Sequence, residues 1–423
     1  MTEFDLSQNK WLRYSAFATL YAAQGIPDAM VLIIFPAYLA ANGMTAAAIG
    51  TFLATAMLPN SAKLFVGPLI DRVAYLPMGR RRPWVIFGQF GIAISFLFLA
   101  SIGEPADNLS LFAIGAFCIT LATVFQDVAT DGMVMDVVPS HEQGRANGIM
   151  WGSKTLGTAA AGASGAAILA FAGFEAMAYF AAAILLVVLI FVLAVKERSG
   201  ERFLPWTAGA TSAETAARQT SSWKILLAQL FAAIRRPSAM RLIGISICIG
   251  LIAGLSGALL PVLLVQEFHW NETDYSQFRS SLKLVAGVAG IFAGGVLVDY
   301  LGHRRSLVTL FATLMAVNFA MAMALRFQLG GLYLAAFEML LVFIFIAFFA
   351  ATMRQCWKMI AATQFSFTMV CGNIALVFGA AMLGPLIEPF GEQGVLFTLA
   401  GFAAIATMIA GGLKLEDQEA ESS

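Results

Sequence analysis

Four acidic residues lie well inside the long apolar stretches of this sequence, away from their ends, and they are the side chains best placed to do chemistry. Asp28 lies in the first stretch, Asp127 and Asp131 lie in the fourth, and Glu338 lies in the tenth. Asp127 and Asp131 are four residues apart, so they would share one face of a helix. An isolated carboxylate in apolar surroundings is costly, so it must be protonated, hydrated or paired. These acids could therefore carry a proton or bind a polar solute.

Basic residues in the same stretches could supply the pairing. They are Lys63, Lys154, Arg279 and Lys283. Asp127 and Lys154 lie about ten and about nine residues from the same end of two consecutive helices, which places them at similar depth at 1.5 Å per residue. We expect an Asp127–Lys154 ion pair, either structural or part of a solute site. Arg279 lies near the end of its stretch, where a long side chain can extend to the membrane surface.

The composition indicates a membrane protein. Of 423 residues, 60% are hydrophobic and 12% are charged, against about 25% charged residues in a soluble domain. A spanning helix needs about 20 mostly apolar residues, so the hydrophobic content matches about twelve helices. This composition disfavours soluble enzymes and nucleic-acid-binding proteins, and we expect an all-α fold. The apolar stretches fall at about 14–41, 46–70, 83–102, 110–137, 145–172, 175–196, 241–266, 275–299, 306–326, 332–353, 361–388 and 393–414.

Lysine and arginine are distributed unevenly over the segments between these stretches. If the N-terminus is cytoplasmic, the segments on the inside hold most of the 25 basic residues, whereas those on the outside hold only Arg326. Basic residues favour the cytoplasmic side of a membrane. We therefore predict that both termini are cytoplasmic, in a multi-pass protein of the bacterial inner (plasma) membrane.

A polar stretch divides the spans into six and six. We predict an N-terminal six-helix bundle over 1–196, a cytoplasmic linker over 197–240 and a C-terminal six-helix bundle over 241–423. From Trp223 to Ile234 apolar residues recur at near-helical spacing beside basic residues, which indicates a helix on the inner membrane surface. A solvated linker is the alternative reading of this segment.

Both halves carry one signature between their second and third spans, about half the chain apart. It reads G-x-L-x-D, followed by a glycine and an arginine cluster. A generic inside loop would supply arginines but not the same glycine and aspartate twice. The residues are Gly67, Asp71, Arg72, Gly79, Arg80, Arg81 and Arg82 in the first half, and Gly295, Asp299, Gly302, Arg304 and Arg305 in the second.

This signature resembles the loop motif of the major facilitator superfamily, and the resemblance covers the whole twelve-span layout. It implies two parallel six-helix repeats. An aspartate at a helix end can contact the positive N-terminus of another helix or an arginine. Asp71, Arg72, Asp299 and Arg304 are therefore expected gate residues, which hold one transporter conformation and release it in the other.

A narrower resemblance concerns three segments. They are similar to those of AmpG-type muropeptide permeases, of related acetyl-CoA transporters and of proteobacterial siderophore importers. The group indicates solute transport better than it indicates the solute. The segments are Gln126-Asp127-Val-Ala-Thr-Asp131-Gly with the following Pro139, Glu142 and Gly144, then Ala362-Thr363-Gln364-Phe365, and Gly25-Ile26-Pro27.

The site residues follow from these placements. In the superfamily that the chain resembles, spans 1, 4, 7 and 10 line the central cavity, and the buried acids fall on three of them. We expect a solute site with Asp127 and Lys154 at its centre. Asp28 has no basic neighbour on its own span and is the expected proton carrier. The full set of expected solute-binding residues is Asp127, Asp131, Lys154, Glu338, Gln24 and Gln126.

Glycine spacing predicts close helix packing in span 5. Gly148-x-x-x-Gly152 and the later Gly157 would let another helix approach closely.

The leading function is therefore a proton-coupled secondary transporter that imports an anionic or zwitterionic solute such as a muropeptide. A siderophore or a coenzyme A ester is the alternative solute, and a membrane-embedded transferase or a sensor is less favoured. The chain shows no P-loop for ATP, no catalytic constellation and no metal-binding histidine spacing. We expect no enzyme activity, no cofactor, no metal and no nucleic acid. The expected partners are a small-molecule solute, protons and the lipid bilayer, and we expect a monomer.

Overall fold

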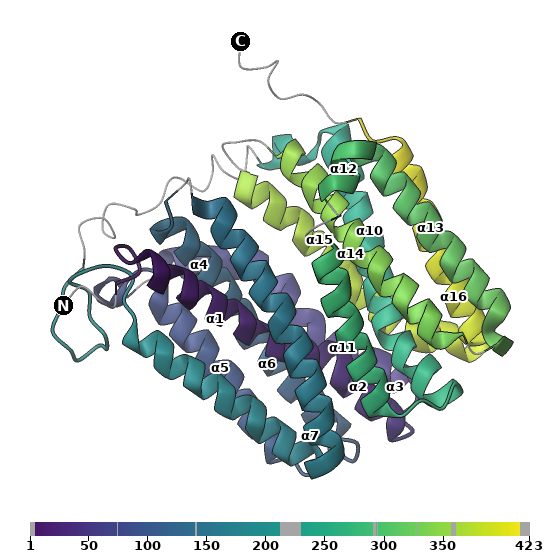
Figure 1. Ribbon diagram of the computed structural model, residues 1–423, viewed down its shortest axis with the longest axis horizontal. Coiled ribbons are helices and arrows are strands. Elements are labelled where there is room, and N and C mark those ends of the chain that lie inside the picture. Colours follow the sequence, from purple (N-terminus) through teal and green to yellow (C-terminus); the bar gives the residue numbers. More distant parts are fainter. Residues whose placement is uncertain are drawn as a thin grey trace. The chain divides into compact units, whose positions relative to one another are not determined.

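The computed structural model describes residues 5–73, 75–139, 142–211, 230–290, 293, 295–327, 329–356 and 361–414. Every regular element of these residues is a helix, apart from one isolated bridge between Asp5 and Lys196 (Figure 1). The all-α class expected from the composition is confirmed.

The helices belong to two compact units. Unit 1 comprises Met1–Ile34 and Ala62–Ser221, and unit 2 comprises Phe35–Ser61 and Ser222–Ser423. The six-helix division at 196 and 241 stays a prediction. Unit 1 holds α1 (Lys10–Ala29), η1 (Met30–Ile34), α4 (Lys63–Arg72), η3 (Leu76–Met78), α5 (Arg82–Ala100), α6 (Leu109–Val137) and α7 (Gln143–Ala194). Unit 2 holds α2 (Phe35–Ala41), α3 (Ala46–Met57), most of η2 (Leu58–Ala62), α10 (Pro237–Pro261), η5 (Val262–Glu267), α11 (Glu272–Ala289), α12 (Gly295–Leu301), α13 (His303–Ala324), η7 (Leu325–Phe327), α14 (Gly330–Gln355), α15 (Ala361–Ala381) and α16 (Leu383–Gly411).

Nine helices of the described residues are long and apolar enough to cross a membrane. Two of them contain a glycine with non-helical backbone angles, Gly173 in α7 and Gly391 in α16. Their φ values of 83° and 61° lie in the left-handed region that glycine adopts readily. The expected boundaries near 173 and 390 therefore coincide with breaks inside single elements. The total of twelve spans stays a prediction.

The first part of α7 packs closely against α1. Gly157 lies so close to α1 that a Cβ there would overlap the carbonyl oxygen of Ala22, and a Cβ on Gly25 would overlap the backbone of Thr158. The close packing expected at Gly157 is thus confirmed. The packing expected at Gly152 is wrong, because a Cβ there meets nothing within 4 Å.

The first copy of the repeated signature forms a tight turn at the start of α5. Gly79 has a φ of 98° and leaves room for the side chain of Glu197. That carboxylate accepts hydrogen bonds from the backbone N–H groups of Arg80, Arg81 and Arg82. It therefore satisfies donors that a helix N-terminus leaves without an intrahelical partner.

The second copy of the signature has the same turn at its glycine, since Gly302 has a φ of 76°. The side chains of Asp71, Arg72 and Asp299 lie outside the described residues. Most of the expected interfacial helix, 212–229, also lies outside them, and the structure describes helical residues at 230–234.

The α1–α7 contact predicts a matched pair of glycine variants. Gly157→Ala should lower the Tm, because its Cβ overlaps backbone atoms of α1 and overpacking costs about 1–3 kcal/mol. Gly152→Ala on the same helix should leave the Tm unchanged or slightly higher, because alanine is the better helix former. Thermal unfolding of both variants in one detergent measures the difference. Equal effects at the two positions would contradict the proposed contact.

Candidate functional site

Five charged side chains gather inside unit 1, and we call them the unit-1 charge cluster: Asp28, Lys63, Asp127, Asp131 and Lys154. They come from α1, α4, α6 and α7, and the four-residue spacing on α6 places two of the acids on one face. The cluster is partly accessible, since the side chains of Lys63 and Asp28 retain 31% and 33% of their exposed area. Ionised groups in such a place can contact water or a solute.

Two ion pairs organise this cluster. Lys63 Nζ lies 2.5 Å from Asp127 Oδ2, and Lys154 Nζ lies 3.0 Å from Asp28 Oδ2. The expected direct pair between Asp127 and Lys154 is therefore wrong. Asp28 has its basic partner on α7, not on its own span. Equal depth does not decide which helix faces which. The close approach of Gly25 and Gly157 brings Asp28, one turn after the first glycine, to Lys154, one turn before the second.

Asp131 has a different partner. The hydroxyl of Tyr21 donates a hydrogen bond to Asp131 Oδ1. Tyr21 is buried, and its ring packs edge-on against Trp151 with 6.4 Å between the centroids. In the described part of the chain, Asp131 has no lysine or arginine within ion-pair distance. Tyr21 lies seven residues before Asp28, on the same face of α1, and this spacing could have indicated it from sequence.

The two glutamines expected to bind solute contact each other instead. Gln24 Nε2 donates to Gln126 Oε1 at 2.8 Å. Both side chains are fully buried between α1 and α6. In this conformation neither exposes a surface that a solute could touch. Their contact pairs the Gln24 amide N–H with the Gln126 carbonyl oxygen, whereas Gln24 Oε1 is buried without a hydrogen-bond partner among the described residues.

Unit 2 contains a second group of buried charges. Arg279 Nε lies 2.7 Å from Glu338 Oε1, and Lys283 Nζ lies 3.7 Å from Glu338 Oε2. Arg279 also donates to the hydroxyl of Tyr275 at 2.8 Å. Arg279 is only 5% exposed, so the expectation that it extends to the membrane surface is wrong. Burial of its guanidinium is compensated by the ion pair with Glu338.

The expected gate residues lie in three helices. Asp71, Arg72 and Asp299 lie in α4 and α12, with side chains outside the described residues. Arg304 lies in the first turn of α13 and is exposed. Their gating role stays a prediction.

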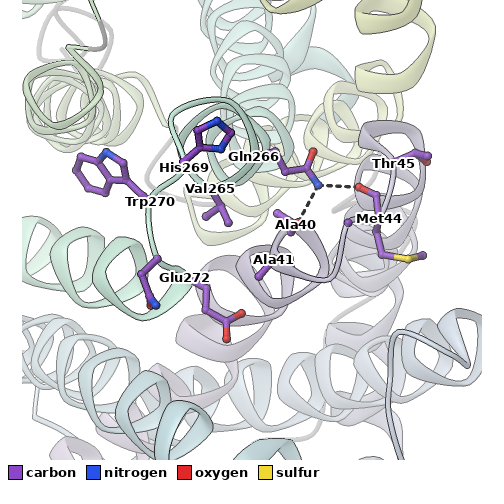
Figure 2. Close-up of a pocket in the computed structure, with 11 residues that line it drawn as sticks. Ala40, Ala41, Met44, Thr45, Val265, Gln266, His269, Trp270 and Glu272 are labelled. Carbon is purple, nitrogen blue, oxygen red and sulfur yellow. Dashed lines mark hydrogen bonds between the residues drawn. The ribbon is translucent and has the colours of Figure 1, made fainter.

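An open pocket of about 670 Å³ lies in unit 2, between the loop after α2 and the loop before α11 (Figure 2). Gln266 Nε2 of η5 donates to the carbonyl oxygens of Ala40 and Met44, each at 2.9 Å, and so joins η5 to the end of α2 and the loop after it. The pocket contains none of the residues expected from sequence to form the site. Its lining residues are Ala40, Ala41, Gly43, Met44, Thr45, Val265, Gln266, His269, Trp270, Asn271 and Glu272. Among the described side chains, no group of three His, Cys, Asp or Glu could hold a metal ion.

Sequence comparison identifies a family. The sequence profile of the Major Facilitator Superfamily matches residues 17–380. A protein of Haemophilus influenzae described as uncharacterized is 30% identical over 127 residues, which are 30% of this chain and 29% of that protein. The matched segment thus spans less than a third of that relative.

Solved structures share the fold. A bacterial homolog of the human lysosomal transporter Spinster, in an inward-facing and unoccupied conformation, aligns with a TM-score of 0.72 at 12% identity. The alignment covers 94% of this chain and 95% of the homolog. A D-xylose–proton symporter aligns with a TM-score of 0.69 at 14% identity, over 97% of this chain and 99% of the symporter. At these identities the likeness shows the fold alone.

The ion pairing of the unit-1 charge cluster can be tested by double-mutant cycles. The coupling energy between Asp28→Asn and Lys154→Met should be about 1 kcal/mol or more, as for residues in contact. The coupling between Asp127→Asn and Lys154→Met should be clearly smaller, because Lys63 is the direct partner of Asp127. Thermal stability of the single and double variants supplies both values. A larger coupling energy for the second pair would show that Asp127 pairs with Lys154, as expected from their depth.

Proposed function

We propose a function on the premise that the chain belongs to the major facilitator superfamily. It is a secondary active transporter that imports an anionic or zwitterionic solute by alternating access, driven by a proton gradient. The observation that carries this proposal is the unit-1 charge cluster. Charged side chains inside membrane helices are costly, and they usually face a cavity, a partner or a transport pathway.

Proton coupling rests on the carboxylates of that cluster. Asp28 lies inside the candidate membrane span Lys10–Ala41, and Asp127 and Asp131 lie one turn apart on one face of α6. A carboxylate can bind a proton on one side of the membrane and release it on the other. The D-xylose–proton symporter of the same fold uses protons, and that comparison adds support from the fold alone.

The class of solute follows from the buried charges of unit 2. Two cations, Arg279 and Lys283, contact the single carboxylate of Glu338. This group therefore carries an excess of positive charge, which favours a solute with a carboxylate or phosphate. A muropeptide of the bacterial cell wall fits this class and the sequence resemblance around Gln126–Asp131. A carboxylate siderophore or a coenzyme A ester is the alternative.

Uptake into proteoliposomes tests the transport function. We expect labelled muropeptide to accumulate when the outside is acidified, and accumulation to be lost after addition of a protonophore. An iron-loaded carboxylate siderophore and a coenzyme A ester, assayed in parallel, decide between the solute classes. Lys283→Met should lower the rate about tenfold, equivalent to about 1.4 kcal/mol. Failure of all three solutes to enter, with folded protein in the vesicles, would favour the transferase or sensor alternatives.

The proposed orientation places both termini in the cytoplasm. Single cysteines in a background without the four native cysteines can report it. A cysteine at the exposed Ala208 should react only after the membrane is permeabilised, whereas one at the exposed Asp107 should react from outside in intact cells. A maleimide that does not cross the membrane measures both. Labelling of Ala208→Cys in intact cells, with Asp107→Cys protected, would reverse the orientation.

A further inference from the structure

The acids and bases of the unit-1 charge cluster do not balance. The cluster has three carboxylates and two lysines, and each lysine lies beside one carboxylate. Lys63 neutralises Asp127, and Lys154 neutralises Asp28. Asp131 is the carboxylate that has no lysine of its own.

The surroundings of Asp131 make its charge the costliest of the three. On α6, Asp127 lies one turn away and repels a second negative charge. Lys63 on α4 and Lys154 on α7 also face Asp131, but both are bound to the other carboxylates. The group facing it from α1 is the hydroxyl of Tyr21, which is neutral.

We propose that Asp131, and not Asp28, is the residue that binds and releases the coupling proton. The inference rests on the proposed proton-coupled transport. Protonation of Asp28 or Asp127 would leave a lysine without its counter-ion inside the membrane, at a cost. Protonation of Asp131 instead removes an unbalanced charge. The side chain is only partly buried, so water can deliver the proton to the carboxylate oxygen and accept it again.

Tyr21 is the positioning residue of this site. Its hydroxyl hydrogen bond holds the Asp131 side chain toward α1, and the ring is held in turn by Trp151. Tyr21→Phe removes the hydrogen bond and keeps the ring. The carboxyl group of Asp131 should then absorb at a changed infrared frequency.

Infrared difference spectroscopy between acidic and alkaline pH tests the proposal on the purified protein, without any solute. The wild-type protein should show the C=O stretching band of one protonated carboxyl inside the protein. Asp131→Asn should lose this band, and Asp131→Glu should retain one at an altered frequency. A band that persists in Asp131→Asn overturns the proposal. If Asp131→Asn does not fold, an unchanged band in Tyr21→Phe overturns it.

The matched controls remove a whole ion pair and keep the unbalanced acid. Asp28→Asn/Lys154→Met and Asp127→Asn/Lys63→Met should both retain the band. If Asp28→Asn/Lys154→Met loses the band and Asp131→Asn keeps it, Asp28 is the proton carrier. Asp28→Asn or Asp127→Asn alone is unsuitable as a control, because each frees a lysine that can pair with Asp131.

Proteoliposomes separate this inference from the proposed function. Solute uptake driven by a pH gradient, with a band that persists in Asp131→Asn, overturns the assignment of Asp131 alone. A band that disappears in Asp131→Asn, with no response of uptake to the gradient, overturns proton coupling.

Discussion

Charge neutralisation inside membrane helices is the constraint on which the rest of this structure depends. A carboxylate or ammonium in such a place is tolerated when a partner or water compensates it. In unit 1 this requirement links α4 to α6 through Lys63 and Asp127, and α7 to α1 through Lys154 and Asp28. The four helices that carry the cluster are therefore joined pairwise by ionic contacts as well as by apolar packing.

Small residues decide which charges meet. Gly25 and Gly157 let α1 and α7 approach until backbone touches backbone, and this contact fixes the rotation and register of both helices. Asp28 and Lys154 lie one turn from these glycines and consequently face each other. At the start of α5, Gly79 has a comparable role, because only a residue without a Cβ leaves room for the carboxylate of Glu197. Glycines thus position charged side chains both at the α1–α7 contact and at the start of α5.

The fold class could be predicted from sequence because hydropathy is a local property. A run of about 20 apolar residues specifies a membrane helix whatever lies beside it. The apolar stretches correspond to single helices, to parts of one helix broken at glycine, or to consecutive helices such as α3, η2 and α4. The charged residues inside the apolar stretches could also be recognised from the local sequence. Their partners could not, because pairing depends on how each helix is rotated about its axis. Depth alone therefore matched Asp127 with Lys154, although the glycine contact turns Lys154 toward Asp28.

The same limit explains the outcome for the polar residues. A glutamine in an apolar stretch signals that some polar partner is near, but not whether that partner is a solute or another helix. Gln24 donates a hydrogen bond to Gln126 between α1 and α6. Tyr21 gave a weak signal because tyrosine is also a common apolar packing residue, and only the contact with Asp131 distinguishes it.

The location of the ion pairs has a consequence for the transport cycle. Lys63–Asp127 and Lys154–Asp28 both lie within unit 1, and Arg279–Glu338 lies within unit 2. A rearrangement of one unit against the other therefore leaves each pair formed, and the electrostatic energy of the pairs contributes little to the difference between conformations. A ligand can shift such an equilibrium only by interacting differently with the two states. In the proposed function, the unbalanced carboxylate of Asp131 and the excess cation beside Glu338 are the groups through which a proton and an anionic solute would change the net charge of a unit, and so bias which conformation it adopts.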